Sequence, residues 1–341
     1  MADLLNAWKQ VGSDLQHLLE SPDSSPFAGE WQLLLTKANQ ENPWFGKNEV
    51  ITAFKGIAHM LSKESLDKWS HSFTLKKTNK VERVVGVIMA GNIPMAGFHD
   101  MLCVSLSGHR LQAKLSSDDS VLLPFMLKLL ASHHPEAASR ISFKGNLKNA
   151  DAIIATGSNN TSRYFEYYFG NKPHIFRKNR NSVAVLTGSE NEYDLLLLGR
   201  DIFTYYGMGC RNVSKLYVPK GYSFDNFFPA MQHYADVMQH NKYMNNFDYN
   251  SAVYLLNTMK FLTNNFLIVI EDTSLHSPVS VVHFEYYENE KELSTKLEMV
   301  SDQLQCIVSK NGKVGFGQTQ LPEVSDYADG VDTMQFLQSI E

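Results

Sequence analysis

The sequence predicts an α/β fold that begins with a helical N-terminal region and continues into a parallel sheet and a second α/β unit. Two observations carry this prediction. Residues 2–73 have the apolar spacing of amphipathic helices, whereas short apolar runs alternate with helical segments from residue 82 onward. This alternation is typical of a parallel sheet that helices cover on both faces.

Length and composition set the broad class of the protein. The chain has 341 residues, of which 43% are hydrophobic, so it can form a sizeable core in one large domain or two interleaved domains. The net charge is -5 and the basic residues are scattered, which argues against a nucleic-acid partner. The chain starts without a basic region followed by an apolar run, and no stretch is long enough to cross a bilayer. We therefore expect a soluble, cytoplasmic protein with no membrane span.

In the helical region, helices are expected after Pro26 and from Asn48, because proline and asparagine favour the first turn of a helix. Short apolar runs then predict the strands of the first sheet: 83–90, 111–115, 152–155 and 182–186. Helical spacing predicts the connections between these strands: 95–106, 120–132 and a helix around Tyr164.

The second unit shows the same alternation of helices and strands. A helix over 191–206 is expected to lead into a loop and a strand at 212–218. The remaining predicted elements are a helix at 224–240, strands at 266–270, 279–286 and 305–309, and a helix at 291–297.

The segment Tyr205–Pro219 places one cysteine behind two glycines and ahead of an alternating strand. Gly207 and Gly209 allow backbone conformations that a Cβ forbids, so a ligand can come close to the sulfur of Cys210. Arg211 adds a positive charge that favours the thiolate. The pattern indicates a nucleophilic thiol on a loop, but the same residues also fit a small, buried structural cysteine.

The other cysteines and the histidines indicate neither a disulfide nor a metal site. Cys103 and Cys306 lie in apolar segments far from Cys210, and no CxxC spacing occurs, which fits a reducing compartment. The histidines lack the one-turn spacing of a metal-binding pair. We therefore expect no metal.

Two turns follow predicted strands at the carboxyl edge of the sheet, where open α/β folds bind ligands. In Gly91–Pro94, Asn92 is placed to donate a hydrogen bond, although it also fits a helix cap or turn residue. The turn formed by Thr156, Gly157 and Ser158 could hold a phosphate on backbone N–H groups, or be a plain turn.

Lys114 lies at the end of the predicted strand 111–115. A lysine in this position is most simply explained as a solvated surface residue. No P-loop occurs, and no Gly-x-Gly-x-x-Gly sequence follows the strand at residue 83. The usual nucleotide-binding fingerprints are therefore missing.

In their order and spacing, these segments resemble the aldehyde dehydrogenase superfamily. Val85–Pro94 is similar to its strand and Asn-x-Pro turn, Ala113–Ser117 to its lysine-containing cofactor strand, and Ala155–Ser158 to its Thr-Gly-Ser turn. The loop of Cys210 resembles the nucleophile loop of that superfamily. Two C-terminal segments resemble its acyl-CoA reductase branch, the LuxC-type fatty acid reductases: Gly315–Gln320 and Asp326–Asp332. The similarity spans residues 83–341.

This resemblance implies an aldehyde dehydrogenase-like fold, in which a Rossmann-like cofactor domain is interleaved with an α/β catalytic domain. The implied divisions are 1–185 for the helical region plus the nicotinamide cofactor domain, 186–315 for the catalytic domain, and 316–341 for a segment that returns to the domain interface. The resemblance also implies Cys210 as the nucleophile and Asn92 as an oxyanion donor. The implied cofactor-binding residues are Lys114, Ser117, Thr156, Gly157 and Ser158.

Two departures from the superfamily pattern narrow the implied chemistry. Arg177 lies near the position where hydrolytic members carry a glutamate that activates water, so thioester exchange is favoured over oxidation to a free acid. The Glu-x-Phe-Gly-Pro motif is blurred into Glu271–Pro278, which leaves open whether Glu271 or Asp272 contacts the cofactor ribose. Little chain precedes residue 83 for a dimerisation hairpin, so a homo-oligomer is compatible with the sequence but its form is open.

The resemblance therefore implies NADPH-dependent reduction of a fatty acyl thioester, carried by CoA or an acyl carrier, to the aldehyde through a Cys210 acyl-enzyme. Ser117 replaces a glutamate that would repel a 2′-phosphate, and Lys114 can pair with that phosphate, so NADPH is expected, with NADH as the alternative. Four large apolar residues could line an acyl tunnel, although such residues near a strand edge more often belong to the core: Phe98, Phe203, Tyr205 and Met208.

Three other functions stay open. An enzyme similar to gamma-glutamyl phosphate reductase would share the nucleophile but take an acyl phosphate. A cysteine hydrolase would need a histidine base, and none can be assigned from spacing. A non-catalytic binding protein on the same scaffold would tolerate loss of the Cys210 thiol.

Overall fold

The computed structural model describes residues 2–71, 82–143, 145–157 and 159–340, with residues 159 and 160 described for their backbone alone. The chain forms two units: Met1–Asn179 with Leu321–Glu341, and Arg180–Gln320. Each unit contains one sheet. In the described ranges, no helix combines the length and the apolarity needed to cross a membrane.

The first unit begins with a layer of four helices: α1 (Ala2–Glu20), α2 (Ala28–Glu41), α3 (Lys47–Met60) and α4 (Lys63–Ser70). Helix α1 is amphipathic and packs against α3. Trp8 is fully buried on its apolar face and meets the ring of Phe98 edge-on at 5.7 Å. A Cβ on Gly12 would lie 2.7 Å from the carbonyl oxygen of Leu61, so this close approach of the helices requires glycine.

The first sheet has five parallel strands: β1 (Val84–Ile88), β2 (Arg110–Lys114), β3 (Ile141–Phe143), β4 (Ala152–Thr156) and β5 (His174–Arg177). Their order is β3-β2-β1-β4-β5. The order reverses between β1 and β4, and this is the point at which doubly wound folds bind their ligands.

Helices connect and cover these strands: α5 (Phe98–Ser107), α6 (Leu122–His133), α7 (Pro135–Ala138) and α8 (Asn159–Phe169). Helix α5 packs on β1 and β2, while α8 packs on β4 and β5. Phe165 of α8 is buried with Ile153 and Ala155 of β4. Because parallel crossovers are right-handed, the two halves of the sheet receive their helices on opposite faces. The last helix, α13 (Thr333–Ser339), packs on α5.

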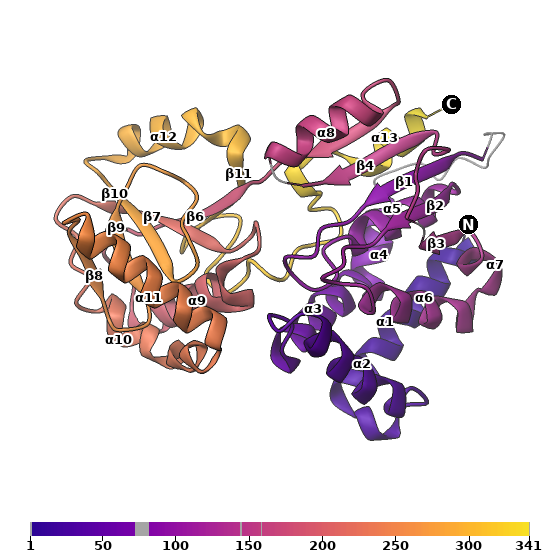
Figure 1. The fold of residues 1–341 in the computed structure, drawn as a ribbon, viewed down its shortest axis with the longest axis horizontal. Helices are drawn as coiled ribbons and strands as arrows, with labels where there is room; N and C mark the ends of the chain where they lie inside the picture. Colours follow the sequence, from indigo (N-terminus) through magenta and orange to yellow (C-terminus); the bar gives the residue numbers. More distant parts are fainter. Residues whose placement is uncertain (1, 72–81, 144, 158, 341) are drawn as a thin grey trace. The chain divides into compact units, whose positions relative to one another are not determined.

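The second sheet has six strands: β6 (Asn181–Val185), β7 (Val213–Pro219), β8 (Phe261–Thr263), β9 (Ile268–Glu271), β10 (Val281–Tyr287) and β11 (Leu304–Val308). Their order is β11-β6-β7-β10-β9-β8, and only the edge strand β8 is antiparallel among them. Three helices lie on one face: α9 (Glu192–Phe203), α10 (Phe227–Met231) and α11 (Asn241–Leu256). Helix α12 (Glu290–Met299) covers the other face with Leu293 and Leu297 (Figure 1).

The predicted fold class is confirmed: a Rossmann-like parallel sheet, a second sheet and a helical N-terminal region are all present. Among the strands and α-helices that the structure describes, those that the sequence did not predict are β3, β5, β8, α7, α11 and α13. They are short, or bury too few side chains to leave a periodic apolar pattern; α11, for example, buries only Tyr243 and Asn250. The predicted domain boundary at residue 185 groups β6 with the first sheet, whereas its hydrogen bonds join it to β7 and β11.

A buried ion pair ties the C-terminal segment into the first unit. The Arg177 guanidinium at the end of β5 is 3% exposed and donates to Asp100 Oδ1 of α5 at 2.7 Å. It also donates to the carbonyl oxygen of Ala328 at 2.7 Å and to Thr333 Oγ1 at 2.9 Å. This one side chain therefore joins β5, α5 and the residues around α13.

Replacing Arg177 with methionine should destabilise the protein strongly, because it leaves the Asp100 carboxylate buried without its partner. We expect a loss of about 3 to 5 kcal/mol in the free energy of unfolding, measured by urea denaturation. The double variant Arg177→Met/Asp100→Leu should recover most of that loss, since no buried charge remains. A double variant as unstable as the single one would contradict this account.

Candidate active site

Cys210 lies in a turn between α9 and the amino end of β7 and is exposed. The other two cysteines differ from it in environment: Cys103 is fully buried in α5, and Cys306 in β11 is half-buried. Burial raises the pKa of the Cys103 thiol well above its ordinary value. Of the three thiols, Cys210 is therefore the one presented to solvent for reaction.

The loop before Cys210 is held in a strained backbone conformation. The predicted helix over 191–206 ends at Phe203 in the structure, and a short 3-10 helix, Thr204–Gly207, follows. Tyr205 and Tyr206 have φ angles of 52° and 56°, in the left-handed region, and Gly207 follows at 78°. For a non-glycine residue such a conformation costs on the order of 1 to 3 kcal/mol. Only Gly207 of the three suits it.

Asn212 is the side chain that holds this loop in place. It is 1% exposed, and its Nδ2 donates to the carbonyl oxygens of Thr204 at 2.7 Å and Asp201 at 3.0 Å. Its Oδ1 accepts from the backbone N–H of Gly209 at 2.9 Å. One buried amide thus bonds the end of α9 on one side of the strained residues and the cysteine turn on the other. The sequence shows no signal for this role beyond a polar residue at the start of a strand.

Two further side chains make contacts around the loop. The Ser182 hydroxyl, fully buried in β6, donates to the Cys210 carbonyl oxygen at 2.9 Å and lies 2.9 Å from Cys306 Sγ. Arg211 donates from Nε to the carbonyl oxygen of Thr319. Arg211, whose positive charge was expected to favour the Cys210 thiolate, therefore also binds the backbone of the segment around Thr319.

That segment is anchored by a buried carboxylate on α9. Asp201 accepts from the backbone N–H of Gly317 at 2.6 Å and from the N–H and hydroxyl of Thr319 at 3.1 and 2.8 Å. Burial raises the pKa of Asp201, although these three bonds oppose the shift. Asp201 thereby fixes the residues that Arg211 contacts.

Replacing Asn212 with alanine should release the cysteine loop. The variant leaves buried carbonyl and N–H groups without partners, so we expect a loss of about 2 to 3 kcal/mol in the free energy of unfolding. The rate at which iodoacetamide alkylates Cys210 should change as well, because the loop no longer holds the thiol in one environment. Asn257→Ala is the matched control, since that exposed amide donates to the carbonyl oxygen of Val253 at its own helix end. Equal effects of the two variants would contradict the assigned role.

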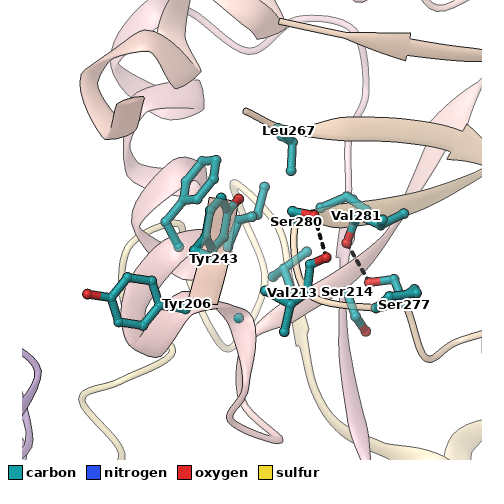
Figure 2. A pocket seen from close by; sticks show the side chains of 14 residues that line it. Tyr206, Val213, Ser214, Tyr243, Leu267, Ser277, Ser280 and Val281 are labelled. Atoms are coloured by element: carbon teal, nitrogen blue, oxygen red, sulfur yellow. Dashed lines mark hydrogen bonds between the residues drawn. The ribbon is translucent and has the colours of Figure 1, made fainter. Parts of the chain in front are cut away.

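A small cavity lies behind the loop (Figure 2). Its lining includes Tyr206 and Gly207 of the loop, Val213 at the start of β7, and Tyr243 and Leu267. Its volume is about 20 Å³, which is room for about one water molecule and far less than a fatty acyl chain requires. Of the expected tunnel residues, Phe203 lines this cavity, whereas Phe98 belongs to the core of the first unit beside Trp8.

In the first unit, strands β1, β2 and β4 end at the same edge of the sheet, and the predicted cofactor residues Lys114 and Thr156 lie at this edge. Ile88 of β1 pairs with Lys114 of β2 on one side and with Ala155 of β4 on the other. Asn92 follows β1 in a turn and is exposed, as is Lys114. A Cβ on Gly91 would lie 2.4 Å from Ser116 Oγ. The turn after β1 and the loop after β2 are therefore in close contact, and only glycine permits it.

The two carboxylates of that loop face different environments. Asp118, next to the exposed Ser117, is itself exposed. Asp119 is 4% exposed, and its Oδ2 accepts from the backbone N–H of Met95 at 2.7 Å. Burial raises the pKa of Asp119 to about 6. Only Asp118 is thus presented on the surface of this loop, and the sequence did not distinguish the two.

The turn after β4 leads directly into the N-terminus of α8. Thr156 and Gly157 are half-buried there, and the Gly157 N–H donates to the Arg177 carbonyl oxygen at 3.3 Å. A Cβ on Gly157 would lie 2.9 Å from the Phe165 ring, so glycine lets α8 pack closely on its strand. Ser158 lies outside the described residues.

These features fit a dinucleotide. The turns after β1 and β4 flank the point where the strand order reverses, a helix N-terminus follows the second turn, and the exposed Lys114 ends β2. In Rossmann folds the carboxyl end of the second strand is where ribose selectivity is set. This edge can therefore hold the pyrophosphate beside α8 and the ribose beside Lys114.

The structure is similar to solved aldehyde dehydrogenases. Aldehyde dehydrogenase 21 from Physcomitrella patens, solved with the product succinate, matches 98% of this chain and 83% of its own with a TM-score of 0.65 and 12% identity. An aldehyde dehydrogenase from Mycobacterium tuberculosis complexed with NAD+ matches 90% of this chain and 77% of its own, with a TM-score of 0.59 and 12% identity. An NADP-dependent enzyme from E. coli matches 91% and 80%, with a TM-score of 0.59 and 12% identity.

No protein-family model and no curated protein sequence matches the chain. At these low identities, the similarity establishes that the chain has the aldehyde dehydrogenase fold.

Proposed function

We propose that the protein is an NADPH-dependent reductase that converts a fatty acyl thioester, carried by CoA or an acyl carrier, to the aldehyde. In this proposal the first unit binds the cofactor and the second carries the nucleophile. The main support is the exposed Cys210 in a chain with the aldehyde dehydrogenase fold. Its loop has a strained backbone that hydrogen bonds from Asn212 hold in place. A purely structural cysteine gives no reason to hold two tyrosines in the left-handed region beside it.

The proposed reaction has two stages. The Cys210 thiolate attacks the thioester carbonyl and forms a new carbon–sulfur bond. The bond between the carbonyl carbon and the carrier sulfur breaks, and the released thiolate takes a proton from solvent. Asn92 and the Cys210 N–H donate to the oxyanion that develops. When bound, the reduced nicotinamide supplies a hydride, which is two electrons, to the acyl carbon. Release of the aldehyde breaks the bond to Cys210 and returns the thiolate.

Arg177 supports thioester reduction over hydrolysis. It lies near the position expected for the glutamate that activates water in hydrolytic members of the superfamily. Its guanidinium is paired with Asp100 and stays protonated at any physiological pH, so it cannot accept a proton from water. An acyl-enzyme without such a base persists long enough to be reduced.

Lys114 and Ser117 support NADPH as the cofactor. Both are exposed at the carboxyl end of β2, where an acidic side chain would repel a 2′-phosphate. The ammonium group of Lys114 can instead form a charge-assisted bond with that phosphate. The exposed carboxylate of Asp118 would instead repel the 2′-phosphate, so NADH is the alternative cofactor.

Mixing the protein with NADPH and acyl-CoA of graded chain length tests the proposed reaction. Cys210→Ser should abolish aldehyde release, whereas Cys306→Ser should retain it. Asn92→Ala should lower kcat by about 100- to 1000-fold, because one oxyanion donor is lost. If no acyl-CoA or acyl-carrier thioester supports Cys210-dependent aldehyde release, the proposal fails. Activity with an acyl phosphate in its place would assign the alternative reductase.

Lys114→Ala should separate the two cofactors. Loss of a charge-assisted bond to the 2′-phosphate should raise the KM for NADPH by about 10- to 100-fold and leave the KM for NADH nearly unchanged. Lys37→Ala, an exposed lysine on α2, should change neither value. Equal shifts for both cofactors would show that Lys114 does not read the 2′-phosphate.

A further inference from the structure

The turn that carries Asn92 contains a backbone conformation that needs external support. Met95, three residues after Asn92, has a φ angle of 56° although it is not glycine, and it is 4% exposed. It precedes α5, whose first residue, Phe98, donates its N–H to the Met95 carbonyl oxygen at 2.9 Å. A left-handed backbone conformation is unfavourable for methionine, so surrounding contacts must maintain it.

Asp119 provides the side-chain contact to this residue. It lies 24 positions further along the chain, in the connection between β2 and α6, and accepts the Met95 N–H at 2.7 Å. The same connection meets the start of the turn, where Gly91 approaches Ser116 and Asp118. Asp119 therefore holds the far end of a turn whose near end is fixed by close packing.

The environment of Asp119 is unfavourable for a carboxylate. Burial raises its pKa, backbone N–H groups of Met95 and Leu122 lower it, and the carboxylate of Glu41 on α2 raises it further. Glu41 is held nearby by the hydroxyl of Ser120 at 2.7 Å. The neighbouring charges on its own loop and on β2, Asp118 and Lys114, are exposed. A buried carboxylate that faces another carboxylate costs stability when ionised, which points to a role other than stability.

We propose that Asp119 is a positioning residue that fixes the Gly91–Met95 turn and thereby aims the Asn92 amide at the reacting carbonyl. This inference rests on the proposed function, and it assigns no contact between Asp119 and substrate. Protonation of Asp119 removes the charge from the acceptor, weakens the bond to Met95 and loosens the turn. Turnover then falls as the pH drops through about 6.

Three variants test this role by kinetics. Asp119→Ala removes the acceptor and should lower kcat by about 10- to 100-fold, because a small misplacement of Asn92 is costly. Asp119→Asn keeps an oxygen acceptor and should restore most of kcat at pH 7.5. Asp151→Asn is the matched control, since Asp151 accepts the N–H of Val84 at 2.7 Å at the opposite end of β1. The control should leave kcat unchanged.

Two comparisons separate positioning from general stability. The ratio of kcat for Asp119→Asn to kcat for the wild type should rise as the pH falls from 7.5 to 5.5, because only the wild type titrates. In an Asn92→Ala background, Asp119→Ala should lower kcat no further, because both changes remove the same donor. A ratio that is constant with pH, or losses that multiply in the double variant, would overturn the proposal.

A measurement without substrate keeps this test independent of the proposed function. Hydrogen exchange in peptides that cover residues 91–97 should be faster in Asp119→Ala than in the wild type, and unchanged in Asp151→Asn. If exchange is unchanged in Asp119→Ala, the positioning role fails whatever the enzyme does. If exchange responds but no Cys210-dependent aldehyde forms, Asp119 still holds the turn and only the proposed reaction fails.

Discussion

The reversal of strand order beside β1 is the constraint on which the first unit depends. Since β1 pairs with β2 on one side and β4 on the other, right-handed crossovers place α5 and α8 on opposite faces of the sheet. Neither helix can then cover the carboxyl ends of β1 and β4. The turns that follow these strands therefore lie at the edge of the sheet where doubly wound folds bind their ligands.

The turn that carries Asn92 and the loop that carries Cys210 are held in place in the same way. At each, non-glycine residues adopt left-handed backbone angles: Met95 in the first unit, and Tyr205 and Tyr206 in the second. A buried polar side chain from beyond each turn holds them there, Asp119 in one case and Asn212 in the other. Strain of this kind persists only where the surroundings impose it. The chain thus spends stability to fix the two turns that carry Asn92 and Cys210.

The sequence predicts the buried strands and the helices between them well. It does not reveal the side chains that hold the turns of Asn92 and Cys210 in place. Strands such as β1, β4 and β7 are visible because their apolar runs are buried, and Cys210 and Asn92 are visible because glycine and proline mark their turns. Asn212, Asp119 and Asp201 leave no pattern, since each acts on backbone atoms distant from its own position. Edge strands β3 and β8 are short and half-covered, so their composition resembles that of loops.

The bonds from Arg177 to Ala328 and Thr333 have a consequence for the order in which the protein can be made. The second unit is one continuous stretch of the chain, Arg180–Gln320. The ribosome therefore synthesises all of it before Leu321–Glu341, the segment that completes the first unit. Until that segment emerges, the Arg177 and Asp100 side chains lack part of their enclosure, and α5 lacks the cover of α13. The unit whose synthesis starts first is therefore the last to close, and a pause near residue 320 would leave its core exposed to chaperones or proteases.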